Sequence, residues 1–175
     1  MSTTNTETHI ILFVKTRKIL DGNIQEGVKF TDNAGDPPGD WSDNPANFQT
    51  TLDYPGTLKI YGRNYNINSS DPDLAGRRVL IKSLVRRDPN GLILLENISL
   101  QSNGTYRPPD DNPISPNYLQ GTVVDPTGLG NDPVEDYDLI INIYDKNGNV
   151  LRDINDKTDF RIDPKLRMRS RGGSH

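Results

Sequence analysis

Short apolar blocks alternate with long polar stretches rich in Pro and Gly along this chain. The pattern is typical of β-strands joined by substantial loops, because a disordered chain would be poor in apolar residues throughout. The first block, 9–16, contains a continuous run of β-forming residues, which predicts a strand buried on both faces. Further strands are predicted at 28–30, 57–61, 78–85, 92–100, 118–124, 137–144, 149–151 and 160–162.

Two tight turns predict hairpins. In Asp88–Gly91, Pro fixes φ and Gly supplies a positive φ, so the blocks on either side are expected to pair. In Asp145–Gly148, the Asn-Gly pair is a strong hairpin signal because both residues tolerate positive φ. Only 71–78 is expected to form a helix, and a short one. The sequence therefore predicts an all-β fold, a single antiparallel β-sandwich or jelly-roll-like domain with long loops.

The length of 175 residues fits one domain, since two cores would each be small and marginal. We expect a flexible N-terminus over 1–8 and the β-sandwich over 9–168. Residues 169–175 have the composition of a vector linker and the start of a polyhistidine tag. The core is predicted to come from four segments, Ile10–Val14, Val79–Val85, Leu92–Leu95 and Leu139–Ile143.

Charge and composition exclude several classes of function. The net charge of −4 disfavours a nucleic-acid-binding protein, which needs a basic surface against phosphates. The chain has no cysteine, which excludes disulfides, thiolate metal sites and cysteine nucleophiles. No apolar run approaches the ~20 residues that span a bilayer, and no signal-peptide pattern opens the chain. We expect a cytoplasmic protein with no nucleic-acid or membrane partner.

Residues for catalysis are scarce. Outside the tag-like end, His9 is the sole histidine, and its place at the head of an apolar strand favours a structural role over that of a base in a catalytic triad. One histidine is too few for a histidine zinc site, and no phosphate-binding Gly-rich loop is present. Paired carboxylates that hydrolyse glycosides remain an alternative, because Asp and Glu are plentiful. The sequence favours a protein that is not an enzyme, with no catalytic residue and no required cofactor.

The one metal that the sequence suggests is calcium, which needs only oxygen ligands from a loop. Asp145, Asn147 and Asn149 have the spacing of the first ligands of a calcium loop. The glycine usual at the sixth position is replaced by Val150, and the glutamate at the twelfth by Asp156. The same residues are also explained by a hairpin turn that holds no metal.

A second candidate site lies in the long loop between 31 and 54. It carries the only tryptophan, Trp41, among the acceptors Asp36, Asp40, Asp43 and Asn44. An exposed aromatic ring with nearby oxygen acceptors can stack on and hydrogen-bond a sugar, with or without calcium. The alternative is that these polar residues are a solvated loop and that the tryptophan folds back over the core.

Two segments resemble the PixA/AidA family of bacterial inclusion-body proteins. The opening stretch 10–20 is similar to that family's first strand, in which an apolar run leads through a polar patch to an Ile-Leu pair. The closing stretch 137–149, followed by Asp163-Pro164, is similar to its last hairpin and terminal Asp-Pro. The resemblance implies a cytoplasmic β-sandwich that accumulates to high levels, and it transfers no catalytic residue. Unprotected edge strands pair with copies of themselves, so we also expect a homo-oligomer.

Overall fold

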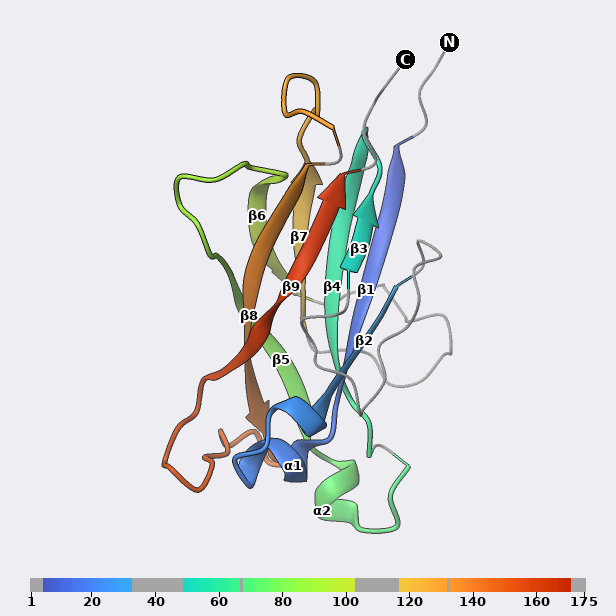
Figure 1. The fold of residues 1–175 in the computed structure, drawn as a ribbon. Helices are drawn as coiled ribbons and strands as arrows, with labels where there is room; N and C mark the ends of the chain where they lie inside the picture. Colours follow the sequence, from blue (N-terminus) through green and yellow to red (C-terminus); the bar gives the residue numbers. More distant parts are fainter. Residues whose placement is uncertain (1–4, 33–48, 67, 103–116, 132, 171–175) are drawn as a thin grey trace.

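Nine strands build the part of the chain that the structure describes, a computed structural model covering residues 5–32, 49–66, 68–102, 117–131 and 133–170 (Figure 1). Two short α-helices and one 3-10 turn accompany them. In chain order the elements are β1 (Thr6–Val14), α1 (Thr16–Leu20), the 3-10 turn (Gln25–Gly27), β2 (Val28–Asp32), β3 (Gln49–Leu52), β4 (Gly56–Asn64), α2 (Pro72–Ala75), β5 (Arg78–Arg86), β6 (Leu95–Ser102), β7 (Asn117–Val123), β8 (Val134–Tyr144) and β9 (Phe160–Ser170).

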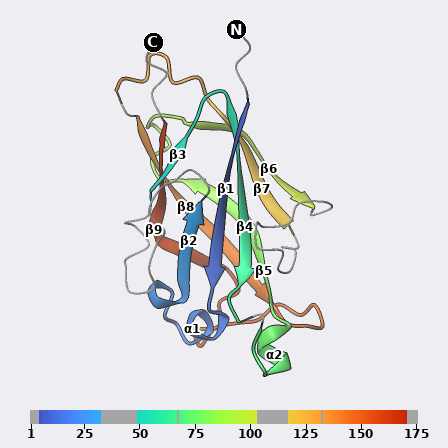
Figure 2. The same ribbon diagram turned by 90° about the vertical axis from the view of Figure 1, so that its right-hand side faces the viewer.

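The strands form two sheets that pack face to face. The five-stranded sheet has the order β2-β1-β4-β7-β6 and the four-stranded sheet the order β3-β9-β8-β5. In Figure 2 the strands of the five-stranded sheet follow one another across the view, and β8 and β5 of the other sheet pass behind them. Neighbours are antiparallel except for two parallel pairs, β1 with β4 and β3 with β9. The predicted all-β sandwich is confirmed.

The core lies between the sheets and follows the two-residue period of the strands. Alternate residues of β1 (Ile10, Leu12, Val14) and of β8 (Leu139, Ile141, Ile143) point inward and are fully buried. Ile11, on the opposite face of β1, is also buried, as the continuous apolar run predicts. Of the predicted core segment Leu92–Leu95, only the last two residues are buried, and Leu92 and Ile93 are exposed. That part of the core prediction is wrong, because the chain crosses here from one sheet to the other.

The first predicted hairpin is a turn without a hairpin. Gly91 donates its N–H to the carbonyl of Asp88 at 3.0 Å, so the turn forms as expected. The strands on either side, however, belong to different sheets: β5 ends the four-stranded sheet and β6 ends the five-stranded one. The predicted pairing is wrong, and the turn is the point where the chain changes layers (Figure 1).

The second predicted hairpin forms, and its paired stretch is short: Asp145 donates its N–H to the carbonyl of Asn149 and Leu151 donates to the carbonyl of Ile143, both at 2.8 Å. Gly148, at φ +84°, donates its N–H to the carbonyl of Asp145 at 3.1 Å. One antiparallel bridge, between Tyr144 and Val150, lies within this stretch, and the next named strand is β9. Along the rest of its length β8 pairs with β5 on one side and β9 on the other. The predicted helix within 71–78 is confirmed as α2, whereas the five-residue α1 was not predicted.

Candidate functional site

Of the two sites suggested by the sequence, one lies outside the described residues and the other within them. The predicted sugar-binding residues Asp36, Asp40, Trp41, Asp43 and Asn44 lie outside the described residues, so carbohydrate binding there stays a prediction. The predicted calcium ligands lie in the turn after β8, and their geometry can be given. Among the residues that the structure describes, no group of three or more His, Asp or Glu is arranged to hold a metal ion.

In that turn, one carboxylate holds the loop together. Oδ1 of Asp145 accepts the backbone N–H groups of Asn147 at 2.9 Å and of Asn149 at 2.8 Å, and Oδ2 accepts the side-chain amide of Asn149 at 3.3 Å. These donors, led by the backbone N–H of Asn149, hold the pKa of Asp145 below its usual value. The three predicted ligands are thus brought together, with Asn149 turned toward the carboxylate as a donor. Calcium binding here stays a prediction.

The next turn repeats the same design. Oδ1 of Asp153 accepts the backbone N–H groups of Asn155 and Lys157, both at 2.9 Å. Asp156, at φ +65°, occupies the position that Gly148 holds in the first turn. Asp153 is therefore the carboxylate of a second turn, and Asp156, the acid at the twelfth position of the calcium-like spacing, is a left-handed turn residue.

His9 lies on the outer face of the five-stranded sheet in an aromatic and charged row. Its Nε2 is 3.3 Å from Glu7, whose other oxygen is 2.7 Å from Nζ of Lys59. The imidazole ring stacks near Tyr61, which in turn packs against the ring of Tyr118 at a centroid distance of 5.3 Å. Burial is the largest cause that lowers the pKa of His9. The structure thus places His9 beside a carboxylate and an aromatic ring, and its structural role stays a prediction.

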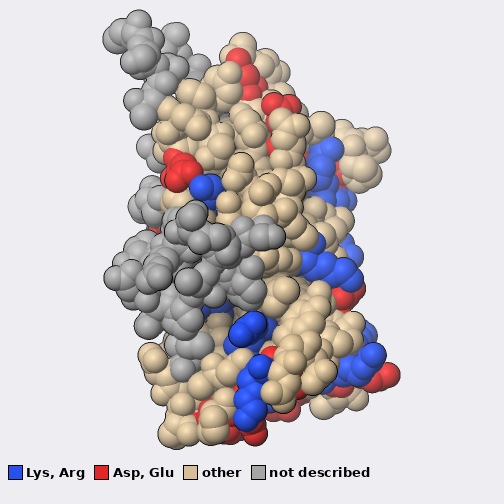
Figure 3. Space-filling view, turned by 180° about the vertical axis from the view of Figure 1, so that it is seen from behind, with Lys and Arg blue, Asp and Glu red and all other residues tan. Residues whose placement is uncertain are grey.

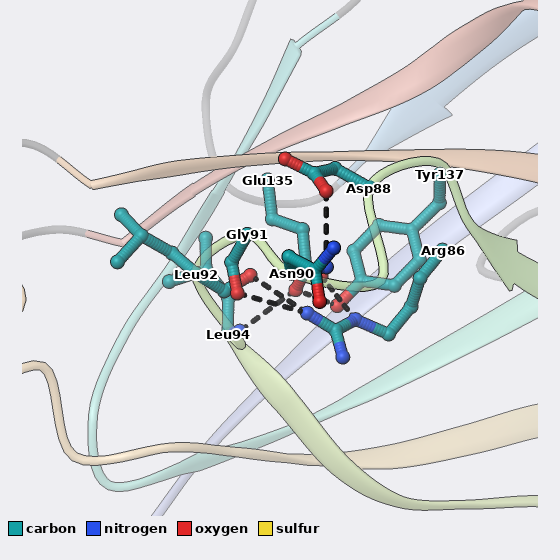
Figure 4. Close-up of polar contacts among 8 residues, drawn as sticks. All are labelled: Arg86, Asp88, Asn90, Gly91, Leu92, Leu94, Glu135 and Tyr137. Atoms are coloured by element: carbon teal, nitrogen blue, oxygen red, sulfur yellow. Dashed lines mark hydrogen bonds and ion pairs between the residues drawn. The ribbon is translucent and has the colours of Figure 1, made fainter.

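A buried polar cluster that the sequence did not reveal supports the crossing between the sheets (Figure 4). Glu135, on the inner face of β8, is only 6% exposed. Its Oε1 accepts the hydroxyl of Tyr137 and the backbone N–H of Leu94, the latter at 2.8 Å. Its Oε2 accepts Nε of Arg86 at 2.6 Å. Together these three hydrogen bonds occupy both oxygens of the carboxylate, so the cluster is structural rather than an open site. We call Glu135, Tyr137 and Arg86, with the backbone of Leu94, the clasp.

The clasp also fixes the shape of the crossing segment. The Nη2 group of Arg86 donates to the carbonyls of Gly91 and Leu92, each at 3.2 Å. The segment is therefore held at its carbonyls by Arg86 and at the N–H of Leu94 by Glu135. Between these anchors, Leu92 and Ile93 face solvent with exposed fractions of 40% and 45%. An immobilised backbone that presents two aliphatic side chains has little entropy left to lose on contact with another surface.

The strand that follows, β6, ends the five-stranded sheet. It pairs with β7 on one side, with a register shift between Glu96 and Ser99, where Asn97 has φ +53°. Beyond the shift, Leu100 lies opposite the buried Leu119, on the face that carries the core, yet its exposed fraction is 48%. The four-stranded sheet thus leaves the edge of the core uncovered at this residue. Exposed aliphatic residues beside a strand edge are a feature of association surfaces.

The opposite sheet protects its edges by other means. The side-chain amide of Asn117, in β7, donates to the carbonyl of Ile81 at 2.8 Å and accepts its N–H at 3.0 Å, so a side chain occupies the edge of β5. The other edge strand, β3, is short, and Thr50, Thr51 and Leu52 are buried. On the face seen in Figure 3, Lys and Arg gather toward one side and the lower end. Within the described chain, β6 is the edge that best combines length, exposure and lack of charge.

Comparison with known proteins supports the fold. No protein-family model matches this chain, and no curated protein matches its sequence. A solved structure described as an inclusion body protein (PixA) from Burkholderia cenocepacia is similar over 97% of this chain and 98% of its own, with a TM-score of 0.62 and 10% sequence identity. The fold resemblance read from the sequence is therefore confirmed. No helix among the described residues is long and apolar enough to span a membrane.

Proposed function

We propose that this protein is a non-enzymatic β-sandwich that associates with copies of itself and accumulates in the cytoplasm. The observation that carries the proposal is the likeness of fold, over nearly the whole of both chains, to a protein described as an inclusion body protein. The match covers 97% of this chain and 98% of the other, so the likeness concerns the whole sandwich rather than one shared motif.

The chemistry of the described residues supports a role without catalysis. The most buried carboxylates, Glu135 and Asp138, lie on opposite faces of β8, so they do not form the facing pair that glycoside hydrolysis requires. Each accepts an arginine, Arg86 for the first and Arg161 for the second, at 2.6 and 2.7 Å. Carboxylate oxygens occupied in this way by arginine are not placed to attack or to protonate a substrate.

Sedimentation velocity over a wide range of protein concentration tests the proposal. We expect the mean mass to rise above the 19.6 kDa of one chain as concentration increases. Fractionation and electron microscopy of cells that produce the untagged protein should show it in dense cytoplasmic particles. A single species of one-chain mass at the highest concentrations, with the protein spread evenly in cells, would contradict the proposal.

A further inference from the structure

We propose that two copies of this chain pair through their β6 strands, antiparallel and about a twofold axis at Leu100. The inference rests on the proposed self-association and names the surface that carries it. It requires that β6 be open on one side, that its charge permit a second copy, and that a register exist in which the exposed side chains meet. Each requirement can be checked against the described residues.

Among the described residues, no strand covers the outer side of β6. The strand is the last of the five-stranded sheet, and in the described part of the chain its one strand neighbour is β7. The N–H and C=O groups of an edge strand that point away from the sheet need partners, and a second strand supplies them in the right spacing. A copy of β6 is such a strand, because an antiparallel pair of identical strands satisfies both partners equally.

Charge favours a second copy at β6 over the other edges. From Leu92 to Ser102 the sequence carries one charged residue, Glu96. The β5 strand, by contrast, carries Arg78, Lys82 and Arg86, and like charges brought opposite one another destabilise a strand pair. Each chain has a net charge of −4, so two copies repel one another, and least where the surface is neutral.

The exposed side chains select the register. With the axis at Leu100, the two leucines lie directly opposite one another, and each covers the half of the other that the second sheet leaves exposed. Ser99 then lies opposite Gln101 of the second copy, and these two types already hydrogen-bond within one chain at 2.9 Å. Ile98 lies opposite Ser102 of the second copy, and the backbone irregularity at Asn97 ends the ladder. Glu96 falls outside it, so no two carboxylates meet.

A cysteine cross-link tests the register directly, since the chain contains no other cysteine. Directly opposite residues of an antiparallel pair have Cα atoms about 4.5–5.5 Å apart, within the range that a disulfide spans. We expect Leu100→Cys to give a covalent dimer as the main species under mild oxidation. Ile154→Cys is the matched control: its exposed fraction is 72%, it lies far from β6, and it should remain mostly monomeric.

A charge substitution tests the surface by an independent route. Leu100→Lys places two ammonium groups opposite one another, and we expect the dimer to dissociate at least tenfold more readily, as measured by sedimentation, than that of the unmodified chain or of Ile154→Lys. Circular dichroism establishes that each variant is folded. Unchanged association of Leu100→Lys, or no cross-link by Leu100→Cys while the protein still associates, overturns the β6 pairing but leaves self-association standing. A chain that is monomeric at every concentration overturns both.

Discussion

Two acidic residues of β8, three positions apart, are almost equally buried but have different hydrogen-bond partners. Glu135 faces inward and accepts one guanidinium, one hydroxyl and one backbone N–H. Asp138 faces outward, is 2% exposed, and accepts Nε of Arg87 at 3.2 Å and of Arg161 at 2.7 Å. The first carboxylate is satisfied by the interior of the protein, and the second by two arginines that cover it.

The contribution of each carboxylate to the free energy of unfolding depends mainly on how buried its hydrogen-bond donors are. Side-chain exposure is 37% for Arg87 and 54% for Arg161, so both guanidinium groups can return to water if Asp138 is lost. The N–H of Leu94 and the hydroxyl of Tyr137 are buried and cannot. A buried donor that loses its acceptor bears the full desolvation cost. Equal burial of two carboxylates therefore does not mean equal contribution to stability.

The largest effect is expected for Glu135→Ala. The change leaves two buried donors and a cavity, and breaking a buried ion pair typically costs about 3–5 kcal/mol of unfolding free energy. Urea denaturation followed by tryptophan fluorescence measures it. The matched control is Glu96→Ala on β6, an exposed glutamate whose loss should change stability by less than about 0.5 kcal/mol. Equal losses in the two variants would show that the clasp contributes nothing.

A smaller effect is expected for Asp138→Asn, which keeps the shape and removes the charge. We expect a loss of about 1–2 kcal/mol, because the carboxylate itself is buried while its two arginines stay hydrated. The urea midpoints of this variant and of the unmodified chain should converge when salt is raised, since screening weakens the exposed side of the pair. If Asp138→Asn lost as much unfolding free energy as Glu135→Ala, the two carboxylates would not differ in the way described above.

The smallest effect at neutral pH is expected for Tyr137→Phe, about 1 kcal/mol, because Glu135 keeps two of its three donors. Its signature is pH dependence. Burial, followed by the hydrogen bond to Glu135, raises the pKa of Tyr137 above its ordinary value. The folded state thus favours the protonated phenol: its contribution is complete below the unfolded pKa of about 10 and is lost as pH rises above it.

Unfolding in urea at pH 8, 9, 10 and 11 checks this sign. The stability difference between the unmodified chain and Tyr137→Phe should shrink, then reverse, as pH passes 10. The other tyrosines are the same in both proteins, so their contributions cancel in the difference. A difference that stays constant over this range would mean that the hydroxyl titrates normally and is not held by the clasp.

Sequence patterns predicted local features well and non-local pairing poorly. The turns at Asp88–Gly91 and Asp145–Gly148 both form, because their chemistry is contained in four residues. The second turn yields the expected pairing over a short stretch, and the first does not. After the first turn the chain joins the other sheet. Glu135, which is 41 residues after Leu94 in the sequence, accepts the N–H of Leu94 there. A hydrogen bond across such a separation leaves no trace in a local pattern.

The β6 edge could not be predicted from the sequence for the same reason, because it depends on non-local pairing. The expectation of a homo-oligomer through an edge strand followed from the fold class, but the identity of the edges depends on sheet order, which no local period encodes. The apolar residues Leu92, Ile93 and Leu100 read from the sequence as ordinary strand residues, the first two as core. The five-residue α1 is too short for a helical period to be visible.

The amide of Asn117 has a consequence for how many neighbours one molecule can take. By occupying both hydrogen-bonding groups of Ile81, it acts as a chain terminator for the four-stranded sheet, much as a capped monomer ends a polymer. With β5 blocked at Ile81, copies that pair through β6 alone would each have one neighbour, so strand addition would stop at two copies instead of running on as a fibre. Growth into a larger particle must then proceed by the packing of finished pairs, which favours a granular and reversible deposit over an amyloid-like one.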